Sequence, residues 1–155
     1  MNKLNCIAIF IKYPEEGKVK TRLAKDIGNK KSKELYIQFV EDIIDKLKNN
    51  SFDISIYYSP KDKENYIKNW LGNTLKYNPQ NGEDLGEKMF NSFIESFKKY
   101  ENVIIIGSDS PDLPIDIINK AFKSLENKKS VIGNTRDGGY YLIGFNKNNF
   151  LPDIF

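Results

Sequence analysis

Apolar and polar residues alternate along this chain with two periods, one typical of helices and one typical of buried strands. Between positions 30 and 48 the apolar residues recur at spacings of three and four, which would give a helix one apolar face. These residues are Tyr36, Phe39, Val40, Ile43 and Leu47. The run at 103–106 is continuously apolar, as expected for a strand covered on both faces. The same criteria predict strands at 4–11, 52–59, 74–77, 102–107, 130–134 and 139–145, and helices from Thr21 to Gly28 and at 30–48, 62–71, 84–99 and 114–126.

The order of these elements predicts the fold class. Strands alternate with helices throughout, and such alternation produces a largely parallel sheet with helices on both faces. The helix at 84–99 has its apolar face at Leu85, Met89, Phe93 and Phe97. No repeat or low-complexity linker divides the 155 residues, a length that suits one domain burying roughly 70% of its unfolded surface. We therefore predict a single three-layer α/β/α domain over residues 1–155, with a mostly parallel mixed sheet.

Composition and charge exclude several classes of protein. Hydrophobic residues make up 39% of the chain and aromatic residues 13%, which is typical of a folded protein. The 24 basic residues exceed the 21 acidic ones by three and are scattered among them, so we expect no nucleic-acid partner. No apolar run has membrane-spanning length, and Cys6 has no second cysteine to pair with, so we expect a cytoplasmic protein. The chain has no histidine, so proton transfer would use carboxylates, lysine, tyrosine or water.

The first segment that could carry chemistry joins the first strand to the first helix. Gly17 frees the backbone there, while Lys12, Lys20 and Arg22 add positive charge. Glycine-rich turns that lead into helices bind phosphate groups through backbone N–H groups and such cations. Arg22 and Arg136 are the only arginines among the 24 basic residues, and each lies in a glycine-bearing loop that follows a strand. The segment indicates a phosphate site, with a solvated lysine-rich turn as the alternative.

The second segment follows the apolar strand at 103–106 and carries Asp109 and Asp112. Ligands of an open α/β sheet bind at the carboxyl ends of its strands, and Mg²⁺ prefers carboxylate and phosphate oxygens. Both residues are therefore candidate metal ligands. The alternative is helix capping, in which Ser110 or Asp112 caps the next helix and a proline occupies its first turn. Capping explains Asp112 better than Asp109.

Two further loops carry turn and capping signals. Asp137 and Gly138 lie between two β-rich runs, which predicts a hairpin. Gly139 and Tyr140 follow, so the backbone could approach a ligand while aromatic rings line a pocket, with core tyrosines as the alternative. In the segment 80–89, Asp84 lies three residues before Glu87, as in a capping box. This loop and helix could also form a wall of the same cleft.

Taken together, these segments resemble the bacterial transferases associated with radical-SAM and selenodomain proteins, within the GT-A glycosyltransferase and nucleotidyltransferase superfamily. The resemblance is ordered and covers nearly the whole chain. It rests on Phe-Ile-Lys at 10–12 with Pro14, Gly17 and Val-Lys-Thr-Arg-Leu at 19–23, on Gln80 with Asp-Leu-Gly at 84–86, on Gly107 with Asp-Ser-Pro-Asp-Leu-Pro at 109–114, and on Asp-Gly-Gly-Tyr-Tyr-Leu-Ile-Gly at 137–144.

The resemblance implies a GT-A-like, Rossmann-type fold and transfer from a nucleotide-activated small-molecule donor, helped by Mg²⁺ or Mn²⁺. Asp109 and Asp137 would be catalytic, and Asp109, with Asp112 as a second candidate, would bind the metal. The implied nucleotide and phosphate site comprises Lys12, Gly17, Lys20, Thr21, Arg22, Gln80, Asp84 and Gly86. The implied acceptor or sugar site comprises Gly138, Gly139 and Tyr140.

Two departures from the family pattern leave a second hypothesis open. Lys88 stands where the family commonly has arginine, and family members continue beyond the segment at 137–144 through a late acidic segment that this sequence lacks. We therefore expect a site without its C-terminal part. Either another copy in a homo-oligomer completes the cleft, or the protein is a non-catalytic nucleotide-binding or subunit-interaction protein.

Overall fold

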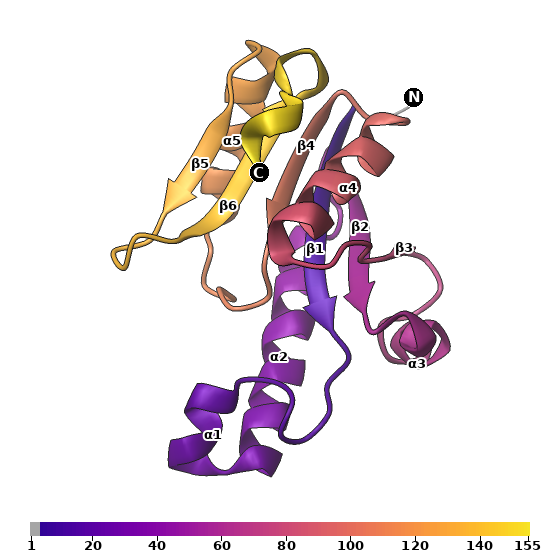
Figure 1. The fold of residues 1–155 in the computed structure, drawn as a ribbon, viewed down its shortest axis with the longest axis vertical. Coiled ribbons are helices and arrows are strands. Elements are labelled where there is room, and N and C mark those ends of the chain that lie inside the picture. The colour runs from indigo at the N-terminus through magenta and orange to yellow at the C-terminus, as the bar shows by residue number, and fades with distance from the viewer. Residues whose placement is uncertain (1–3) are drawn as a thin grey trace.

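The computed structural model describes residues 4–155 and confirms the predicted three-layer α/β/α architecture (Figure 1). Within these residues the sheet has six strands in the order β3-β2-β1-β4-β6-β5. The strands are β1 (Asn5–Lys12), β2 (Asp53–Ser59), β3 (Lys76–Pro79), β4 (Asn102–Ile106), β5 (Val131–Asn134) and β6 (Tyr140–Asn146). The helices are α1 (Thr21–Ile27), α2 (Asn29–Leu47), α3 (Glu64–Leu71), α4 (Leu85–Phe97) and α5 (Ile115–Glu126). The 3₁₀ turn Lys61–Lys63 precedes α3, so that helix begins two residues later than predicted.

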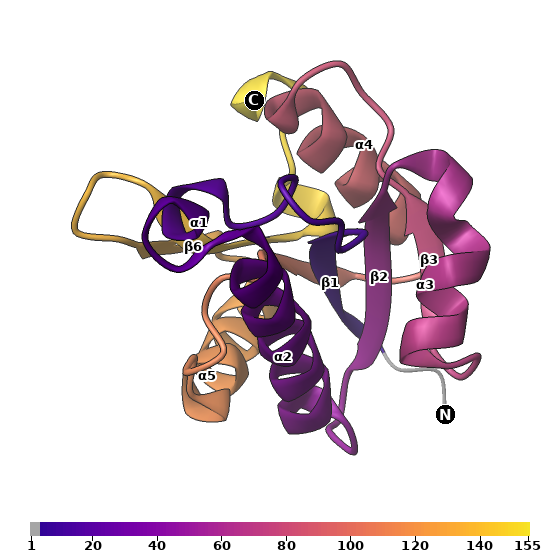
Figure 2. The same ribbon diagram turned by 90° about the horizontal axis from the view of Figure 1, so that it is seen from below.

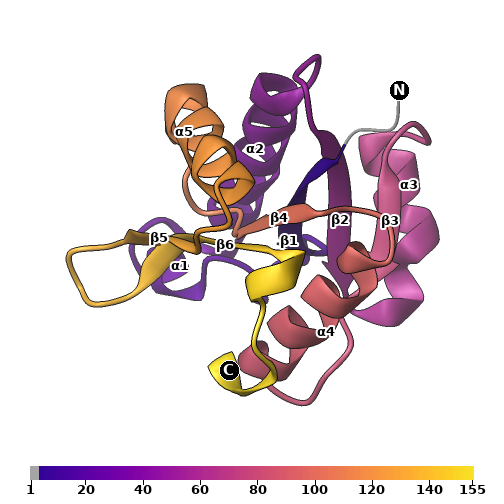
Figure 3. The same ribbon diagram turned by 90° about the horizontal axis from the view of Figure 1, so that it is seen from above.

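Helices cover both faces of the sheet (Figures 2 and 3). Helices α2, α3 and α5 pack on one face, where Ile67 and Ile118 join the larger core cluster. Helix α4 packs on the other face with an aromatic group that includes Phe93, Phe97 and Phe145. Among residues 4–155, no helix combines the length and apolar character needed to cross a membrane.

The predicted apolar face of α2 is the inner face of that helix. Tyr36, Val40, Ile43 and Leu47 are each at most 5% exposed, because spacings of three and four place them over the sheet. The corresponding prediction for α4 is wrong at one end. Leu85 is 62% exposed because it is the first residue of the helix and lies beyond the edge of the aromatic group.

Strand direction gathers the predicted site loops at one edge of the sheet. β1, β2, β3 and β4 run parallel, so the loops that follow them emerge together at the lower edge in Figure 1. β6 is antiparallel to β4, with Leu142 opposite Ile106, so β6 starts where β4 ends. β5 is antiparallel to β6 and brings the hairpin turn between them to the same edge.

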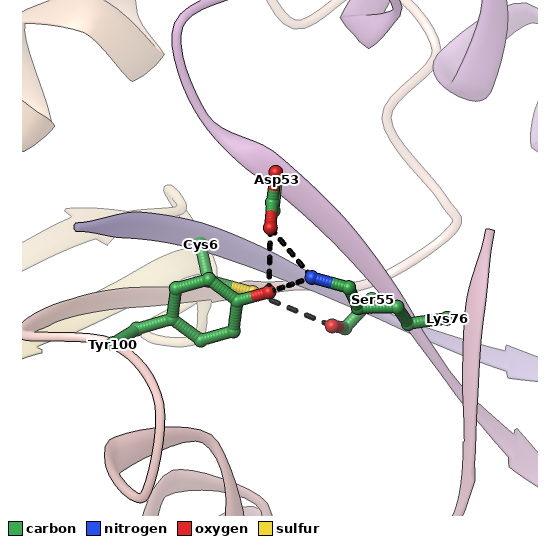
Figure 4. A network of polar contacts seen from close by, with 5 residues as sticks. All are labelled: Cys6, Asp53, Ser55, Lys76 and Tyr100. Atoms are coloured by element: carbon green, nitrogen blue, oxygen red, sulfur yellow. Dashed lines mark hydrogen bonds and ion pairs between the residues drawn. The ribbon is translucent and has the colours of Figure 1, made fainter. Parts of the chain in front are cut away.

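The opposite edge holds a polar clamp of Asp53, Lys76 and Tyr100, which begin or precede three different strands (Figure 4). The Asp53 carboxylate accepts hydrogen bonds from Lys76 Nζ at 2.5 Å and from the Tyr100 hydroxyl at 2.7 Å. Burial lowers the pKa of Lys76, but its hydrogen bonds with Asp53 and Tyr100 outweigh burial and raise that pKa above its usual range. Beside the clamp, the buried Cys6 thiol donates to Ser55 Oγ at 3.5 Å. The clamp fixes the strands at the edge remote from the predicted site.

Candidate functional site

A pocket of about 360 Å³ lies at the carboxyl edge of the sheet, between the loop after β4 and the β5–β6 hairpin. Asp109 and Asp137, two predicted site residues 28 positions apart in the sequence, both line it. The full lining is Ile106, Gly107, Asp109, Ser110, Leu113, Thr135, Asp137, Gly139, Tyr140 and Tyr141. The pocket has the position that open α/β sheets give to ligands.

Asp109 connects this pocket to the loop after β1. Its carboxylate lies 2.5 Å from Lys20 Nζ, and its side chain is 77% exposed while that of Lys20 is 18% exposed. The Lys20 ammonium also lies 5.0 Å from the centre of the Phe39 ring, so a cation–π contact from α2 helps to hold it. The predicted phosphate-binding cation and the predicted metal-binding acid therefore neutralise each other.

The loop after β1 turns sharply into α1. Gly17 has φ of 77° and Lys20 has φ of 49°, and Thr21 is the first residue of the helix. Lys12 and Arg22 are exposed to solvent. Helix α1 has only seven residues, so the loop's capacity to bind an anion depends mainly on its cationic side chains and not on the helix dipole.

The β5–β6 turn holds Asp137 as an anion. The Thr135 hydroxyl donates to Asp137 Oδ1, and the Gly139 backbone N–H donates to the same oxygen at 3.3 Å. These hydrogen bonds lower the pKa of Asp137, and the positive charge of Arg22 lowers it further. Gly138 has φ of 89°, which explains the glycine at this position in the turn. The predicted hairpin is confirmed, and its carboxylate is electrostatically coupled to Arg22 at the start of α1.

Both tyrosines after the turn line the pocket, but only Tyr140 is exposed, because Tyr141 is half-buried and packs against the larger core cluster. Tyr140 is 42% exposed, and its hydroxyl donates to Met89 Sδ at 3.5 Å, which links the hairpin to α4. The Tyr141 ring packs on Gly133, where an added Cβ would lie 2.5 Å from Tyr141 Cζ. Gly133 thereby sets the position of one aromatic wall.

The predicted nucleotide-binding residues of the segment 80–89 are Gln80, Asp84 and Gly86, and the first two make structural contacts. The Gln80 side-chain amide donates to Ile11 O at 3.1 Å and to Tyr57 O at 2.9 Å, which bridges β1 and β2. Asp84 is the N-cap of α4 and accepts from Glu87 N at 2.8 Å, so the capping alternative is confirmed. Gly86 is half-buried in the first turn of α4. These three residues lie outside the lining of the Asp109–Asp137 pocket.

The capping hypothesis for Asp112 and Ser110 is wrong. The N-cap of α5 is Pro114, and no side chain caps that helix among the described residues. Lys46 of α2 instead donates to Pro111 O and, at 3.1 Å, to Leu113 O, so a cation fixes this turn through its carbonyl groups. Asp112 is exposed and lies outside the pocket lining.

Three residues that the sequence did not assign to the site hold it together, namely Phe39, Ser108 and Tyr36. Ser108 Oγ donates to the Tyr36 hydroxyl at 3.2 Å, and the Lys12 backbone N–H donates to the same oxygen at 2.8 Å. The apolar pattern placed Tyr36 and Phe39 in the core. Nothing in the sequence indicated that the Tyr36 hydroxyl would be hydrogen-bonded there or that the Phe39 ring would contact a cation. For Ser108, the only indication in the sequence was that it precedes Asp109, a candidate site residue.

A family model described as an uncharacterised protein conserved in bacteria (DUF2064) matches residues 43–155. This chain belongs to that DUF2064 family. No curated protein matches it. A crystal structure named as that of a candidate nucleotide-diphospho-sugar transferase from Desulfovibrio desulfuricans is 43% identical, with a TM-score of 0.93 over 97% of this chain and 67% of that one. The GT-A-like fold predicted for this DUF2064 protein is therefore confirmed, whereas the narrower resemblance to radical-SAM and selenodomain-associated transferases stays a prediction.

Two more distant structures share the fold of this DUF2064 protein. CMP:2-keto-3-deoxy-manno-octonic acid synthetase, solved with CTP, is 11% identical, with a TM-score of 0.55 over 94% of this chain and 75% of that one. The protein Rv0371C from Mycobacterium tuberculosis, solved with manganese, is 6% identical, with a TM-score of 0.55 over 96% of this chain and 73% of that one.

The carboxylates at the pocket of the DUF2064 protein suit a divalent cation whose remaining ligands come from a substrate. Residues 4–155 contain no group of three histidine, cysteine, aspartate or glutamate side chains that could enclose a metal ion. Asp109 and Asp137 provide hard carboxylate oxygens on one pocket, and Mg²⁺ is commonly bound by one or two carboxylates together with substrate phosphates. The residues therefore suit a cation that arrives with a phosphorylated ligand.

A second pocket of the DUF2064 protein, with a volume of about 440 Å³, lies between β3 and α4. Neither pocket lining contains a lysine or arginine, so the two differ in their carboxylates. The lining of this second pocket contains one carboxylate, Glu95, which pairs with Lys98, so it offers a divalent cation fewer oxygen ligands than Asp109 and Asp137 do. The smaller Asp109–Asp137 pocket is the better candidate site.

Proposed function

We propose that this protein is a transferase that uses a nucleotide-activated donor, either a nucleotide sugar or a nucleoside triphosphate, together with Mg²⁺ or Mn²⁺. The observation that carries the proposal is the ion pair between Lys20 and Asp109, a residue that lines the pocket. A donor with its metal supplies a better partner to each residue, because its phosphates suit Lys20 and its cation suits Asp109. The names of the 43%-identical relative and of the CTP-bound synthetase support this class of donor.

The cationic and acidic side chains would have different roles in transfer. Lys20, Lys12 and Arg22 would neutralise the donor phosphates, while Asp109 and Asp137 would hold the cation and the acceptor. The bound cation would stabilise the negative charge that develops on the leaving phosphate groups. Phosphoryl and glycosyl transfer depend chiefly on alignment and charge neutralisation, which suits a site without histidine.

The proposed transfer exchanges one bond to the donor for another. An acceptor oxygen forms a bond to the sugar carbon or to the α-phosphorus, and the bond from that atom to the leaving diphosphate oxygen breaks. The electron pair stays on the diphosphate, and the acceptor proton passes to water or to Asp137. The lowered pKa of Asp137 keeps it ionised at neutral pH, so it would orient an acceptor hydroxyl better than it would donate a proton.

Binding measurements test the proposal directly. CTP, UTP, GTP and ATP, each with Mn²⁺, are titrated into the protein by calorimetry, and we expect at least one to bind in a metal-dependent manner. Asp109→Asn and Arg22→Met should each weaken that binding at least about 10-fold, the scale of a lost charge-assisted contact. Asp116→Asn and Lys25→Met are matched controls, because they remove the same charges at exposed positions on α5 and α1. Failure of all four nucleotides to bind would contradict the proposal.

A non-catalytic nucleotide-binding role is the second candidate. It is favoured by the lack of a three-ligand metal cluster within residues 4–155. In that case the protein would bind a nucleotide but would not cleave it. Release of pyrophosphate or diphosphate by the pure protein, abolished in Asp109→Asn, would decide for the transferase.

A further inference from the structure

The hydroxyl of Tyr36 is a polar group in an otherwise apolar position. Tyr36 lies on the inner face of α2 and is 5% exposed. Burying a hydroxyl is unfavourable unless it is hydrogen-bonded, so phenylalanine would serve better if the position were used only for packing. The hydroxyl accepts two hydrogen bonds, from Lys12 N at 2.8 Å and from Ser108 Oγ at 3.2 Å.

These two partners lie where the sheet splits. β1 and β4 are paired up to Ile9 and Ile106, but beyond that point β1 continues only with β2, as far as Lys12 opposite Ser59. The two loops of the candidate site begin beyond the split, so strand pairing does not fix them to each other. The Tyr36 hydroxyl bridges the gap between Lys12 and Ser108.

The same face of α2 supports the charged pair. Phe39 lies one turn after Tyr36, and its ring centre is 5.0 Å from Lys20 Nζ. Lys20 in turn pairs with Asp109, the residue after Ser108. One turn of α2 therefore contacts the start of the first loop, its cation and the residue next to the candidate metal ligand.

We propose that Tyr36 is a positioning residue that sets the separation between the phosphate-binding loop and Asp109, an inference that rests on the proposed function. Tyr36 is buried behind both loops, so it acts through Lys12 and Ser108 and not by contact with the donor. Burial raises the pKa of Tyr36, so the hydroxyl stays protonated at neutral pH. Without the hydroxyl the two loops lose their common anchor, and the phosphate and metal sites no longer keep a fixed spacing.

A ligand-free experiment tests the anchor itself. Tyr36→Phe keeps the ring and removes the hydroxyl, and hydrogen exchange of the Lys12 amide, followed by NMR, reports the lost bond. We expect that amide to exchange at least about 10-fold faster, while the amides of α4 and β2 keep their rates. Tyr58→Phe is the matched control, because Tyr58 is 2% exposed and its hydroxyl donates to Glu64, away from the pocket. An unchanged rate at Lys12 would overturn the proposal.

A binding experiment tests the consequence for the site. With Mn²⁺ and whichever of CTP, UTP, GTP and ATP binds the wild type, Tyr36→Phe should weaken nucleotide binding about 10-fold, in the range seen when outer-sphere partners of a metal site are removed. Ser108→Ala should act in the same direction, and the double variant should be no worse than Tyr36→Phe alone, because both changes remove one shared hydrogen bond. A purely structural role would lower the melting temperature of Tyr36→Phe and Tyr58→Phe alike and leave the affinity of both intact.

The two experiments separate the failure of this inference from the failure of the proposed function. Equal nucleotide affinity of the wild type and Tyr36→Phe would overturn the positioning role even if transfer is real. If the wild type binds none of the four nucleotides, the proposed function fails, while the exchange rate of the Lys12 amide still decides whether Tyr36 anchors the two loops.

Discussion

Lys20 Nζ lies 2.5 Å from Asp109 Oδ1, although 88 residues separate these two side chains in the sequence. The pair joins the loop after β1 to the loop after β4. Asp109 is largely exposed, so the pair contributes little to the stability of the fold, about 1 kcal/mol or less. The pair neutralises both charges, and under the proposed function a donor phosphate would replace Asp109 at Lys20 while the cation would replace Lys20 at Asp109.

Removal of the lysine should therefore have opposite effects on two ligands. In Lys20→Met the Asp109 carboxylate is released, so Mn²⁺ alone should bind a few-fold more tightly, while Mn²⁺-dependent nucleotide binding should weaken about 10-fold or more. Electron paramagnetic resonance measures free Mn²⁺, and calorimetry measures the nucleotide. The hypothesis fails if both affinities fall together, because Lys20 would then support the metal site without competing for Asp109.

The N-cap of α4 predicts a change in stability that is independent of ligand binding. Asp84→Ala should destabilise the protein by about 1 kcal/mol, because the Glu87 N–H loses its acceptor. Asp84→Ser restores a capping oxygen and should recover most of the loss in a denaturant titration. If Asp84 also bound the donor, Asp84→Ser would stay defective in nucleotide binding despite its restored stability.

The close packing of the Tyr141 ring on Gly133 should make a side chain at position 133 destabilising. In Gly133→Ala the new methyl group would collide with the Tyr141 ring, at a cost of about 1–3 kcal/mol. Gly107→Ala is the comparison for stability, because nothing lies within 4 Å of its added Cβ. Thermal unfolding should show a clear loss for Gly133→Ala and a small one for Gly107→Ala, and equal losses would contradict the packing argument.

The hydroxyl of Thr135 should help to set the pKa of Asp137. Thr135→Val removes the hydroxyl that donates to Asp137 while keeping the size of the side chain, so the pKa of Asp137 should rise toward its usual value. A ¹³C-detected NMR titration of the carboxyl group measures this change directly. A pKa that stays low in Thr135→Val would assign the effect to the Gly139 N–H and Arg22 instead.

Alkaline pH should unfold the protein through its buried hydroxyl and thiol groups. Burial raises the pKa of Tyr57 and Tyr100 to about 12 and that of Cys6 to about 11, from ordinary values of 10.0 and 9.0. Because these pKa values are higher in the folded state, their stabilising effect is complete below about pH 9 and is lost as the pH rises to about 12. Guanidinium unfolding midpoints should therefore fall between pH 9 and 12, and less steeply in Tyr57→Phe. A midpoint that does not change over this range would contradict the assignment.

The sequence predicted the fold and several residues that line the candidate pocket because both depend on local patterns. The apolar period of α2, the Asp-Gly turn and the carboxylate after β4 are each readable within about ten residues. The anchoring contacts are not, since Tyr36 lies 24 residues from Lys12 and 72 from Ser108. A core stripe specifies which residues are buried, but the partner of a buried hydroxyl depends on how distant segments pack.

The errors have the same origin. Asp112 has the sequence context of a helix cap, yet Lys46 fixes that turn from another helix. Leu85 fits the apolar period of α4, yet it extends past the aromatic layer into solvent. Local propensity was overruled in both places by the neighbours that tertiary packing supplies.

The reversal of β6 has a further consequence. Because the turn at 135–139 joins two neighbouring antiparallel strands, residues can be exchanged or inserted there without shifting the parallel strands or the loops that follow them. The opposite wall of the pocket, the loop after β4, is tied to α2, since Ser108 Oγ donates to the Tyr36 hydroxyl and Lys46 donates to Leu113 O. One side of the pocket is therefore held by contacts to a helix, while the other is a turn whose length could be changed by mutation without displacing those contacts.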